Sequence, residues 1–314
     1  MRNSNSGLEQ SSVKKAWLKG RLLKLAGLVM FSVAGVLAYV GVTDFIKSES
    51  KSSLSFILSL MVIPFIVYGK KSYRRGKQLT ARSADNLLSK DTRPPLLYLR
   101  SFIEDGTTSS EMGPSGLTEI ALKSLVVSGG TVFSYFFNKS EEELLANIFR
   151  KLGPCIAIGI PDEQLPPLGM ARMKLPEEEW QAKVQELLSR AQVVILRAGH
   201  TKKFLWEVEQ AIKLVRPERL LFLLPFPTNP ALAGRESSRY VKFRQDIEQH
   251  LPCKLPAFHG ASINEGSLTG VLFFGPDWSP HVIALDKFGS TLPLKTLLKK
   301  ALKPFFAQLK RENL

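Results

Sequence analysis

Hydrophobic and polar positions divide this chain into two long apolar spans followed by an alternation of short apolar runs and amphipathic segments. The two spans are the uncharged runs Leu25–Thr43 and Ser53–Gly69, of 19 and 17 residues. A helix of ~20 apolar residues crosses the ~30 Å hydrocarbon core of a bilayer. The pattern therefore predicts a transmembrane hairpin over residues 25–69.

Basic residues flank this predicted hairpin on its outer sides, whereas its connector, residues 44–52, holds two acids and two lysines. An excess of Lys and Arg marks the cytoplasmic side of a membrane span. We therefore expect a multi-pass protein of the cell inner membrane with both termini in the cytoplasm. A cleaved signal peptide or two buried helices of a soluble protein are the alternatives, and a second apolar run so soon after the first disfavours the signal peptide.

The net charge of +15 is unevenly distributed. Residues 1–91 hold 15 Lys/Arg and 5 Asp/Glu, while the remaining residues hold 28 and 23. The basic excess thus belongs mainly to the membrane part, so we expect no specific nucleic-acid binding and a lipid bilayer as partner. The basic run after the second span either only sets the topology or also attracts anionic lipid.

The composition of the chain indicates the boundaries of the segments on either side of the predicted hairpin. Residues 1–24 form a basic cytoplasmic N-terminus, whose first 13 residues are polar and predicted to be disordered. Residues 70–91 form a basic linker that ends where two prolines follow Arg93, because residues before proline leave the helical region. Residues 92–314 form the cytoplasmic domain.

In this domain, apolar runs alternate with helical patterns. Strands are predicted at 95–102, 155–160, 192–197 and 219–226, and helices at 117–127, 140–152, 176–190 and 203–215. Such alternation predicts a parallel sheet with helices on both faces. Residues 128–139 fit no assignment. Beyond 227 the pattern weakens to a helix at 237–250, a strand at 270–274 and a helix at 292–310.

Several chemical signatures are missing from the sequence. It has no GxxxxGK[ST] loop, no GxGxxG after a strand and no GxSxG elbow, which disfavours nucleotide kinases, dinucleotide-binding dehydrogenases and α/β-hydrolases. Its two cysteines, Cys155 and Cys253, and its four histidines show no metal-ligand spacing. We expect neither a metal nor a resident cofactor.

The strand ends supply the candidate ligand-binding residues, because carboxyl ends of parallel strands share one edge of the sheet, where open α/β sheets bind ligands. These residues are Arg100 and Ser101 at the end of the first strand, Gly159 at the end of the second, and Gly199, His200 and Thr201 at the end of the third, followed by Trp206 and Glu207 in the next helix.

Each charged candidate has a chemical and a plain structural interpretation. Arg100 suits a phosphate, or an ion pair with Glu104 or Asp105. Arg172 suits an anion clamp or an exposed loop. The Glu207 carboxylate could bind ribose hydroxyls or stabilise an oxocarbenium-like transition state. In the plain interpretation it complements the helix dipole.

Two further candidates also have double interpretations. His200 is an acid–base candidate or a residue of a surface turn. Trp206 is a base-stacking residue or a core aromatic at helical spacing.

The stretch Gln192–Ala211, with the helix start Glu207-Val208-Glu209-Gln210-Ala211, and the Arg-Ser-Phe end of the first strand resemble TIR (Toll/interleukin-1 receptor) domains and nucleoside deoxyribosyltransferase-like folds. The resemblance covers about residues 95–226 and implies a flavodoxin- or TIR-like parallel sheet with Glu207 as the catalytic glutamate. Enzymatic members cleave the nicotinamide–ribose bond of NAD, and others are signalling scaffolds. The layout also resembles bacterial inner-membrane proteins with a two-helix anchor, some thought to serve in defence.

These patterns lead to one leading expectation and two alternatives. The leading expectation is a membrane-anchored signalling or defence effector that recognises a nucleotide or NAD, with NAD glycohydrolase activity and NAD as substrate. One alternative is a non-enzymatic module that self-associates at the membrane as a homo-oligomer. The other is an effector that perturbs the bilayer when a ligand binds.

Overall fold

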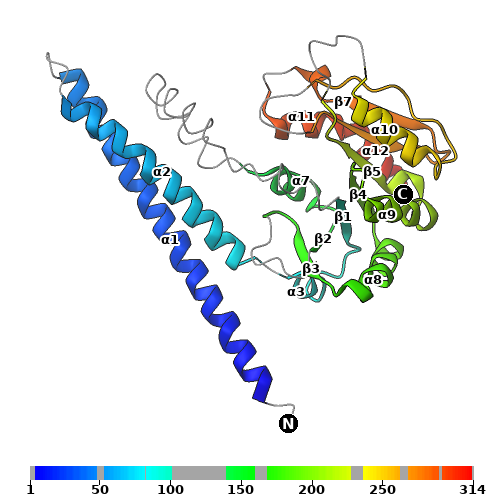
Figure 1. Ribbon diagram of the computed structural model, residues 1–314, viewed down its shortest axis with the longest axis horizontal. Helices are drawn as coiled ribbons and strands as arrows, with labels where there is room; N and C mark the ends of the chain where they lie inside the picture. The colour runs from blue at the N-terminus through cyan, green and yellow to red at the C-terminus, as the bar shows by residue number, and fades with distance from the viewer. Residues whose placement is uncertain are drawn as a thin grey trace. The chain divides into compact units, whose positions relative to one another are not determined.

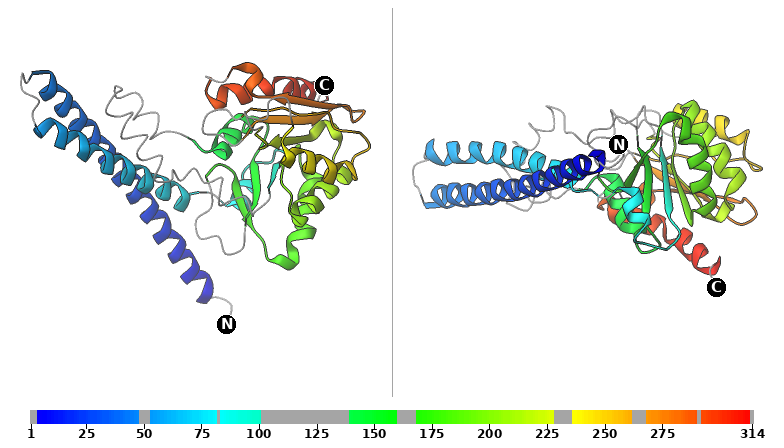
Figure 2. Two further views of the ribbon diagram at one scale, coloured as in Figure 1. Left: turned by 45° about the horizontal axis from the view of Figure 1, so that its top comes forward. Right: turned by 90° about the horizontal axis from the view of Figure 1, so that it is seen from below.

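The computed structural model describes residues 4–47, 53–81, 83–100, 139–159, 168–227, 236–261, 268–289 and 292–312. It divides into two compact units, one containing the helix pair of residues 1–81 and the other containing the α/β fold (Figures 1 and 2). Ser101, the helix predicted at 117–127 and the unassigned segment up to residue 138 lie outside the described residues.

The first unit is an antiparallel pair of helices, α1 (Ser4–Lys47) and α2 (Ser53–Leu79) (Figure 1). Helix α1 is continuous from Ser4, so the polar segment predicted to be disordered is a helical extension instead. Both predicted apolar spans are helical along their whole length.

Small residues form the contact between α1 and α2. They recur every seven residues on α1, where Gly20, Gly27, Ala34 and Gly41 are all buried. A Cβ atom added at Gly27 would lie 2.6 Å from the carbonyl oxygen of Gly69. Glycine at such sites lets two helix backbones approach closely, as in membrane helix pairs.

Replacing Gly27 with leucine should therefore separate the two helices, because overpacking a close contact costs about 1–3 kcal/mol. Gly35→Leu is the matched control, since a Cβ at Gly35 meets no atom within 4 Å. Disulfide cross-linking of a protein carrying Ala34→Cys and Ile66→Cys, two positions in one buried cluster, reports the approach. The cross-linked fraction should fall several-fold with Gly27→Leu alone, and equal yields in both variants would contradict this packing.

Helix α1 contains the one segment among the described residues that is long and apolar enough to cross a membrane, Lys14–Gly41. Only 11% of its most apolar window is buried, and its large apolar side chains are exposed along its length. A core helix of a soluble protein would bury most of this surface. The side chains of α2 before Met61 are not described, so the second span stays a prediction.

The second unit contains a seven-stranded sheet in the order β3-β2-β1-β4-β5-β6-β7. Its strands are β1 (Leu96–Arg100), β2 (Cys155–Gly159), β3 (Ala171–Lys174), β4 (Val193–Arg197), β5 (Leu220–Leu224), β6 (Gly270–Phe274) and β7 (Pro280–Ala284). The first five are parallel, whereas β6 pairs antiparallel with β5 and β7 pairs antiparallel with β6. The α/β class and a mostly parallel sheet are confirmed, and the sheet is mixed rather than all parallel.

Two strands, β3 and β7, were absent from the sequence prediction. Both lie at sheet edges, have four or five residues and are only partly buried. A short edge strand carries no long apolar run, so its hydrophobic pattern is weak.

Helices cover both faces of the sheet (Figure 2). One face packs against α8 (Glu177–Arg190), α9 (Lys202–Leu214) and α10 (Ser238–Glu248), and the other against α7 (Glu141–Phe149), α11 (Leu294–Ala301) and α12 (Lys303–Glu312). A short helix, α3 (Ala84–Leu88), contributes Ala84 to the first face. The predicted C-terminal helix is split at Leu302, because Pro304 fits only the first turn of a new helix.

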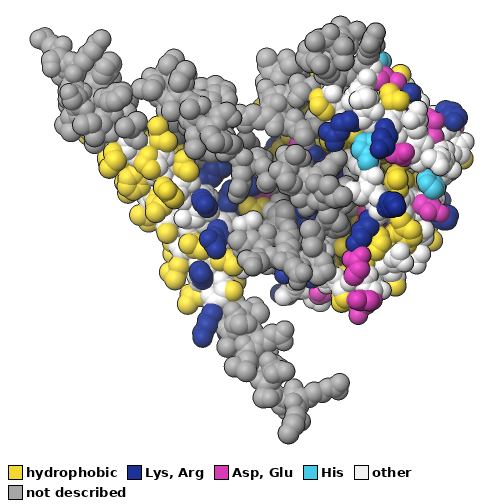
Figure 3. Space-filling view, in the orientation of Figure 1, with side chains coloured by type: hydrophobic (Ala, Val, Ile, Leu, Met, Phe, Trp, Pro, Cys, Tyr) yellow, Lys and Arg dark blue, Asp and Glu magenta, His cyan; other side chains and the backbone are white. Residues whose placement is uncertain are grey.

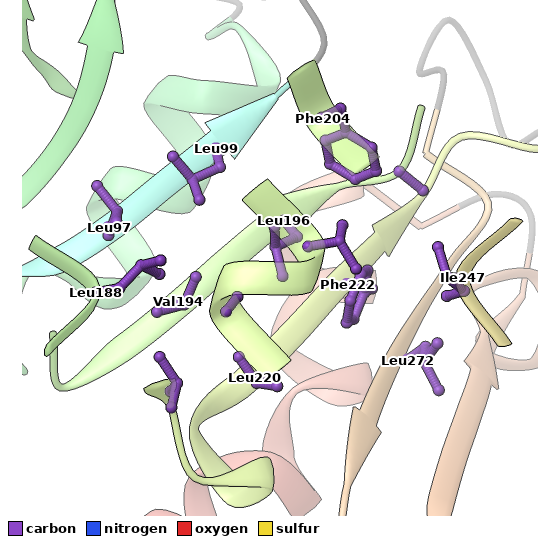
Figure 4. Packing of buried hydrophobic residues seen from close by; sticks show 14 of the residues in the cluster. Leu97, Leu99, Leu188, Val194, Leu196, Phe204, Leu220, Phe222, Ile247 and Leu272 are labelled. Carbon is purple, nitrogen blue, oxygen red and sulfur yellow. The ribbon is translucent and has the colours of Figure 1, made fainter. Parts of the chain in front are cut away.

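Alternation along the strands fixes which side chains reach which face. Leu97 and Leu99 of β1 point toward the α8–α9 layer, where they lie with Leu188, Leu196 and Phe204 (Figure 4). Tyr98 of β1 belongs to the opposite cluster. Because alternate strand residues share a face, the last residue of β1 points to the side that α7 covers.

The connections create a switch point in the sheet. From β1 the chain proceeds to β2 and β3 on one side, and then crosses β1 to continue with β4 and β5 on the other. Ligands of open α/β sheets bind where the strand order reverses, beyond the carboxyl ends of the strands. In this fold that position lies at the ends of β1 and β4.

Candidate functional site at the carboxyl edge of β1 and β4

Two arginines occupy the switch point. Arg100 is the last residue of β1 and Arg197 the last residue of β4, and the two are partners in the parallel register. Both side chains are nearly buried. Register partners on adjacent strands present their side chains on one face, so two guanidinium groups lie side by side under α7.

Carboxylates at the start of α7 contact both arginines. Arg100 Nη1 lies 2.8 Å from Glu142 Oε1, and Arg197 Nη1 lies 2.6 Å from Glu141 Oε2. Glu141 also accepts a hydrogen bond from the backbone N–H of Leu268, at 3.2 Å. The acidic first turn of α7 therefore meets the basic strand ends, and acids at a helix N-terminus also complement the helix dipole.

A third arginine completes this cluster. Arg172, on β3, donates from Nη2 to both oxygens of Glu142 at 2.8 Å, and its side chain is only 4% exposed. It is thus not the exposed loop arginine of the plain interpretation. Glu142 is shared by Arg172 and Arg100. We call Arg100, Arg172, Arg197, Glu141 and Glu142 the arginine–glutamate cluster.

The surroundings of the cluster have a low polarity. Tyr98, two residues before Arg100, is buried on the same face. Burial raises the pKa of the Tyr98 hydroxyl well above its usual value, and the nearby Glu142 raises it further, whereas Arg197 and Arg100 lower it. Charged hydrogen bonds are strong in such surroundings, and planar guanidinium groups match carboxylates and phosphates.

Glu207 lies on the other face of the sheet. It belongs to α9, whose first turn is capped by Thr201, the hydroxyl of which accepts from the backbone N–H of Phe204 at 3.3 Å. The Glu207 side chain is buried, at 2% exposure, and among the described residues its Oε2 has no hydrogen-bond partner. Burial raises the pKa of Glu207 to about 8, an effect that Lys203 and the indole of Trp180 only partly offset. At pH 7 this carboxyl is mostly protonated.

Two tryptophans lie beside this carboxyl group. The rings of Trp180 on α8 and Trp206 on α9 are 4.8 Å apart between centroids, with planes inclined by 44°. Lys203 Nζ lies 5.4 Å from the Trp180 ring and forms an ion pair with Glu177. The Trp180 Nε1 has no hydrogen-bond partner of good geometry within the described residues, although the indole lies close enough to the Glu207 carboxyl to lower its pKa. Trp206 packs against the core, as its plain interpretation predicted.

The remaining predicted residues end β2 and β4. His200 Nδ1 lies 3.6 Å from Asp246 Oδ2, with its ring 5.9 Å from that of Phe226. Gly199 is buried two residues after the end of β4, and Gly159 is buried at the end of β2. Their roles in ligand binding stay predictions.

The structure thus separates the predicted site residues, which were expected to share one edge of the sheet, into two groups. Arg100 lies in the arginine–glutamate cluster under α7, while Glu207, a residue of α9, lies on the opposite face of the sheet. Arg197 was not among the predicted site residues, although it is the last residue of the predicted strand 192–197. For Glu141 and Glu142, the sequence indicated only that they lie at the start of the predicted helix 140–152, and no binding role.

Within the described residues, no group of three or more His, Cys, Asp or Glu is placed to hold a metal ion. Comparisons of the chain with protein-family models, with curated proteins and with solved structures find no match.

Proposed function

We propose that the α/β domain binds a small anionic ligand of the nucleotide type at the carboxyl edge of β1 and β4. The observation that carries this proposal is the register pairing of Arg100 with Arg197 at the point where the strand order reverses. Two adjacent guanidinium groups suit a phosphate, and doubly wound sheets bind nucleotides at this position. The choice of a nucleotide over a simpler anion rests on this analogy with other sheets of the kind.

Calorimetric titration of the full chain in detergent with NAD, ATP and inorganic phosphate tests the binding. Arg197→Gln should weaken binding about 10-fold or more, because a hydrogen bond to a charged group contributes about 1.5–3 kcal/mol. Arg190→Gln is the matched control, since Arg190 is an exposed arginine of α8 paired with Glu186. Failure of all three compounds to bind, or equal binding by both variants, would refute the site.

A second candidate function is hydrolysis of the nicotinamide–ribose bond of NAD, with Glu207 assisting. It is favoured by the buried carboxyl group with a raised pKa, since such groups concentrate at functional sites. Because Glu207 is buried, the side chains around it would have to move before a substrate could reach it. Water would attack the anomeric carbon while the C–N bond breaks and nicotinamide leaves as a neutral molecule, and the proton of the water would pass to solvent. Ionised Glu207 would stabilise the oxocarbenium-like transition state.

This role predicts NAD loss in vesicles or cells that contain the protein, abolished by Glu207→Gln. Because Glu207 must be ionised to act, the rate should rise as pH increases through about 8. Glu209→Gln, which removes a partly exposed glutamate of the same helix, should keep the activity. Unchanged NAD with the unmodified protein would exclude the activity and favour a binding or assembly module.

The membrane arrangement that we propose is a two-helix hairpin with both termini and the α/β domain in the cytoplasm. The exposed apolar segment Lys14–Gly41, the close antiparallel pairing with α2 and the basic outer flanks support it. Together with the ligand site, this arrangement suits a membrane-anchored signalling or defence effector.

A further inference from the structure

We propose that the basic end of the helix pair binds anionic phospholipid headgroups selectively. This end, which we call the basic collar, comprises Lys19, Arg21 and Lys24 of α1 and Lys70, Lys71, Arg74, Arg75 and Lys77 of α2. The inference rests on the proposed membrane span and adds a lipid class to it.

Pairing of the helices makes one surface from two segments about 50 residues apart in the chain. Lys24 Nζ donates to the Thr80 hydroxyl at 3.0 Å. At Gly76, an added Cβ would lie 2.5 Å from the carbonyl oxygen of Gly20. At 1.5 Å per residue, the collar spans about 8 Å along α1 and about 11 Å along α2. Its cations therefore lie within about one or two Debye lengths of each other.

The two helices supply almost no charge to oppose the collar. The sequence has no Asp or Glu between Lys14 and Thr43, and none between Ser53 and Ala84. Like charges held this close repel, and an anionic surface offsets the repulsion. The headgroups of anionic lipids supply such a surface, at ~1 kcal/mol for each basic residue near it.

Apolar side chains at the same end of α1 favour a lipid surface over a soluble polyanion. Trp17, Leu18 and Leu22 are each about half exposed or more. The Trp17 ring also lies 4.7 Å from the Arg21 guanidinium carbon. In Figure 3, Lys and Arg side chains lie along the lower half of the helix pair, among and below hydrophobic ones. Basic residues next to tryptophan and leucine match the boundary between headgroups and acyl chains.

Fluorescence quenching of Trp17 tests the selectivity. The full chain is reconstituted in phosphatidylcholine vesicles that contain equal fractions of either brominated phosphatidylglycerol or brominated phosphatidylcholine. Subtracting the signal of a Trp17→Phe protein isolates Trp17 from the other three tryptophans. We expect brominated phosphatidylglycerol to quench Trp17 at least about twofold more strongly than brominated phosphatidylcholine does.

A triple variant, Arg74→Gln with Arg75→Gln and Lys77→Gln, should lose this preference. The matched control removes three exposed lysines of the α/β domain, Lys299, Lys300 and Lys303, and should keep it. Equal quenching by both lipids, or a preference that survives in the collar variant, would overturn the inference while leaving the span intact. Absence of quenching by either lipid would instead refute the span. Loss of the preference on adding inorganic phosphate would assign the collar to free phosphate and overturn the lipid assignment.

Discussion

Glu207→Gln is expected to stabilise the α/β domain at pH 7 by about 3 kcal/mol. The pKa of Glu207 is raised from 4.5 to about 8 by burial. Between these values the unfolded chain has an ionised Glu207 while the folded chain keeps it protonated. The native state therefore loses about 1.4 kcal/mol of stability from this group for each pH unit of increase. Glutamine keeps the size of the side chain and removes the ionisation.

The stability difference between Glu207→Gln and the unmodified protein should depend on pH. Below about pH 4.5, Glu207 is protonated in both states, so the two proteins should unfold at nearly the same urea concentration. Their difference should grow as the pH rises to about 8 and then stay constant. Urea unfolding followed by tryptophan fluorescence, at several pH values in detergent, measures this difference.

The matched control for this prediction is Glu209→Gln. Glu209 lies on the same helix but is partly exposed to solvent, and its ion pair with Lys213 lowers its pKa. Its replacement should give no gain that grows with pH. A pH-independent stability difference for Glu207→Gln would contradict the burial of an unpaired carboxyl. A stabilised protein that has also lost NAD hydrolysis would show that the carboxyl is retained for function at a cost to stability.

Glu142→Ala is expected to have the opposite effect, a loss of about 3–5 kcal/mol in the free energy of unfolding. Removing one partner of a buried ion pair leaves an uncompensated buried charge. Glu142 contacts two arginines, Arg100 and Arg172, so its loss affects both. The free energy of unfolding again provides the measurement.

Two comparisons make the Glu142 prediction specific. Glu177→Ala removes an exposed ion pair with Lys203 and should cost less than about 1 kcal/mol. Added phosphate should restore part of the stability of Glu142→Ala, because an anion can occupy the place of the missing carboxylate. A Glu142→Ala protein as stable as the Glu177→Ala protein would show that the cluster tolerates unpaired arginines. Absence of phosphate rescue would argue against an anion site at this edge.

Local patterns in the sequence were sufficient for most elements of the sheet and its helices. The strand and helix predicted at 192–197 and 203–215 occur as β4 and α9, each within one residue. A continuous apolar run marks the strand and a period of 3.6 residues marks the helix, and both are properties of consecutive side chains that can be recognised without knowing the fold. The helix predicted at 176–190 likewise occurs as α8, at Glu177–Arg190.

The order and direction of strands required contacts between distant residues. Nothing local to β6 shows that it pairs antiparallel with β5, and the edge strands β3 and β7 form only beside a neighbouring strand. The arginine–glutamate cluster depends on the same long-range pairing, since Arg172 and Glu142 are 30 residues apart in the sequence.

Glu207 is the clearest case of a residue whose position is predicted by the local sequence but whose environment is not. The sequence places it in the first half of an amphipathic helix after a strand, and the structure agrees. Its burial beside Trp180 of another helix is a property of helix packing, and with it come the protonation of the carboxyl and its separation from Arg100. Charge states and site partners follow from which surfaces are excluded from water, and that exclusion is set by the whole fold rather than by neighbours along the chain.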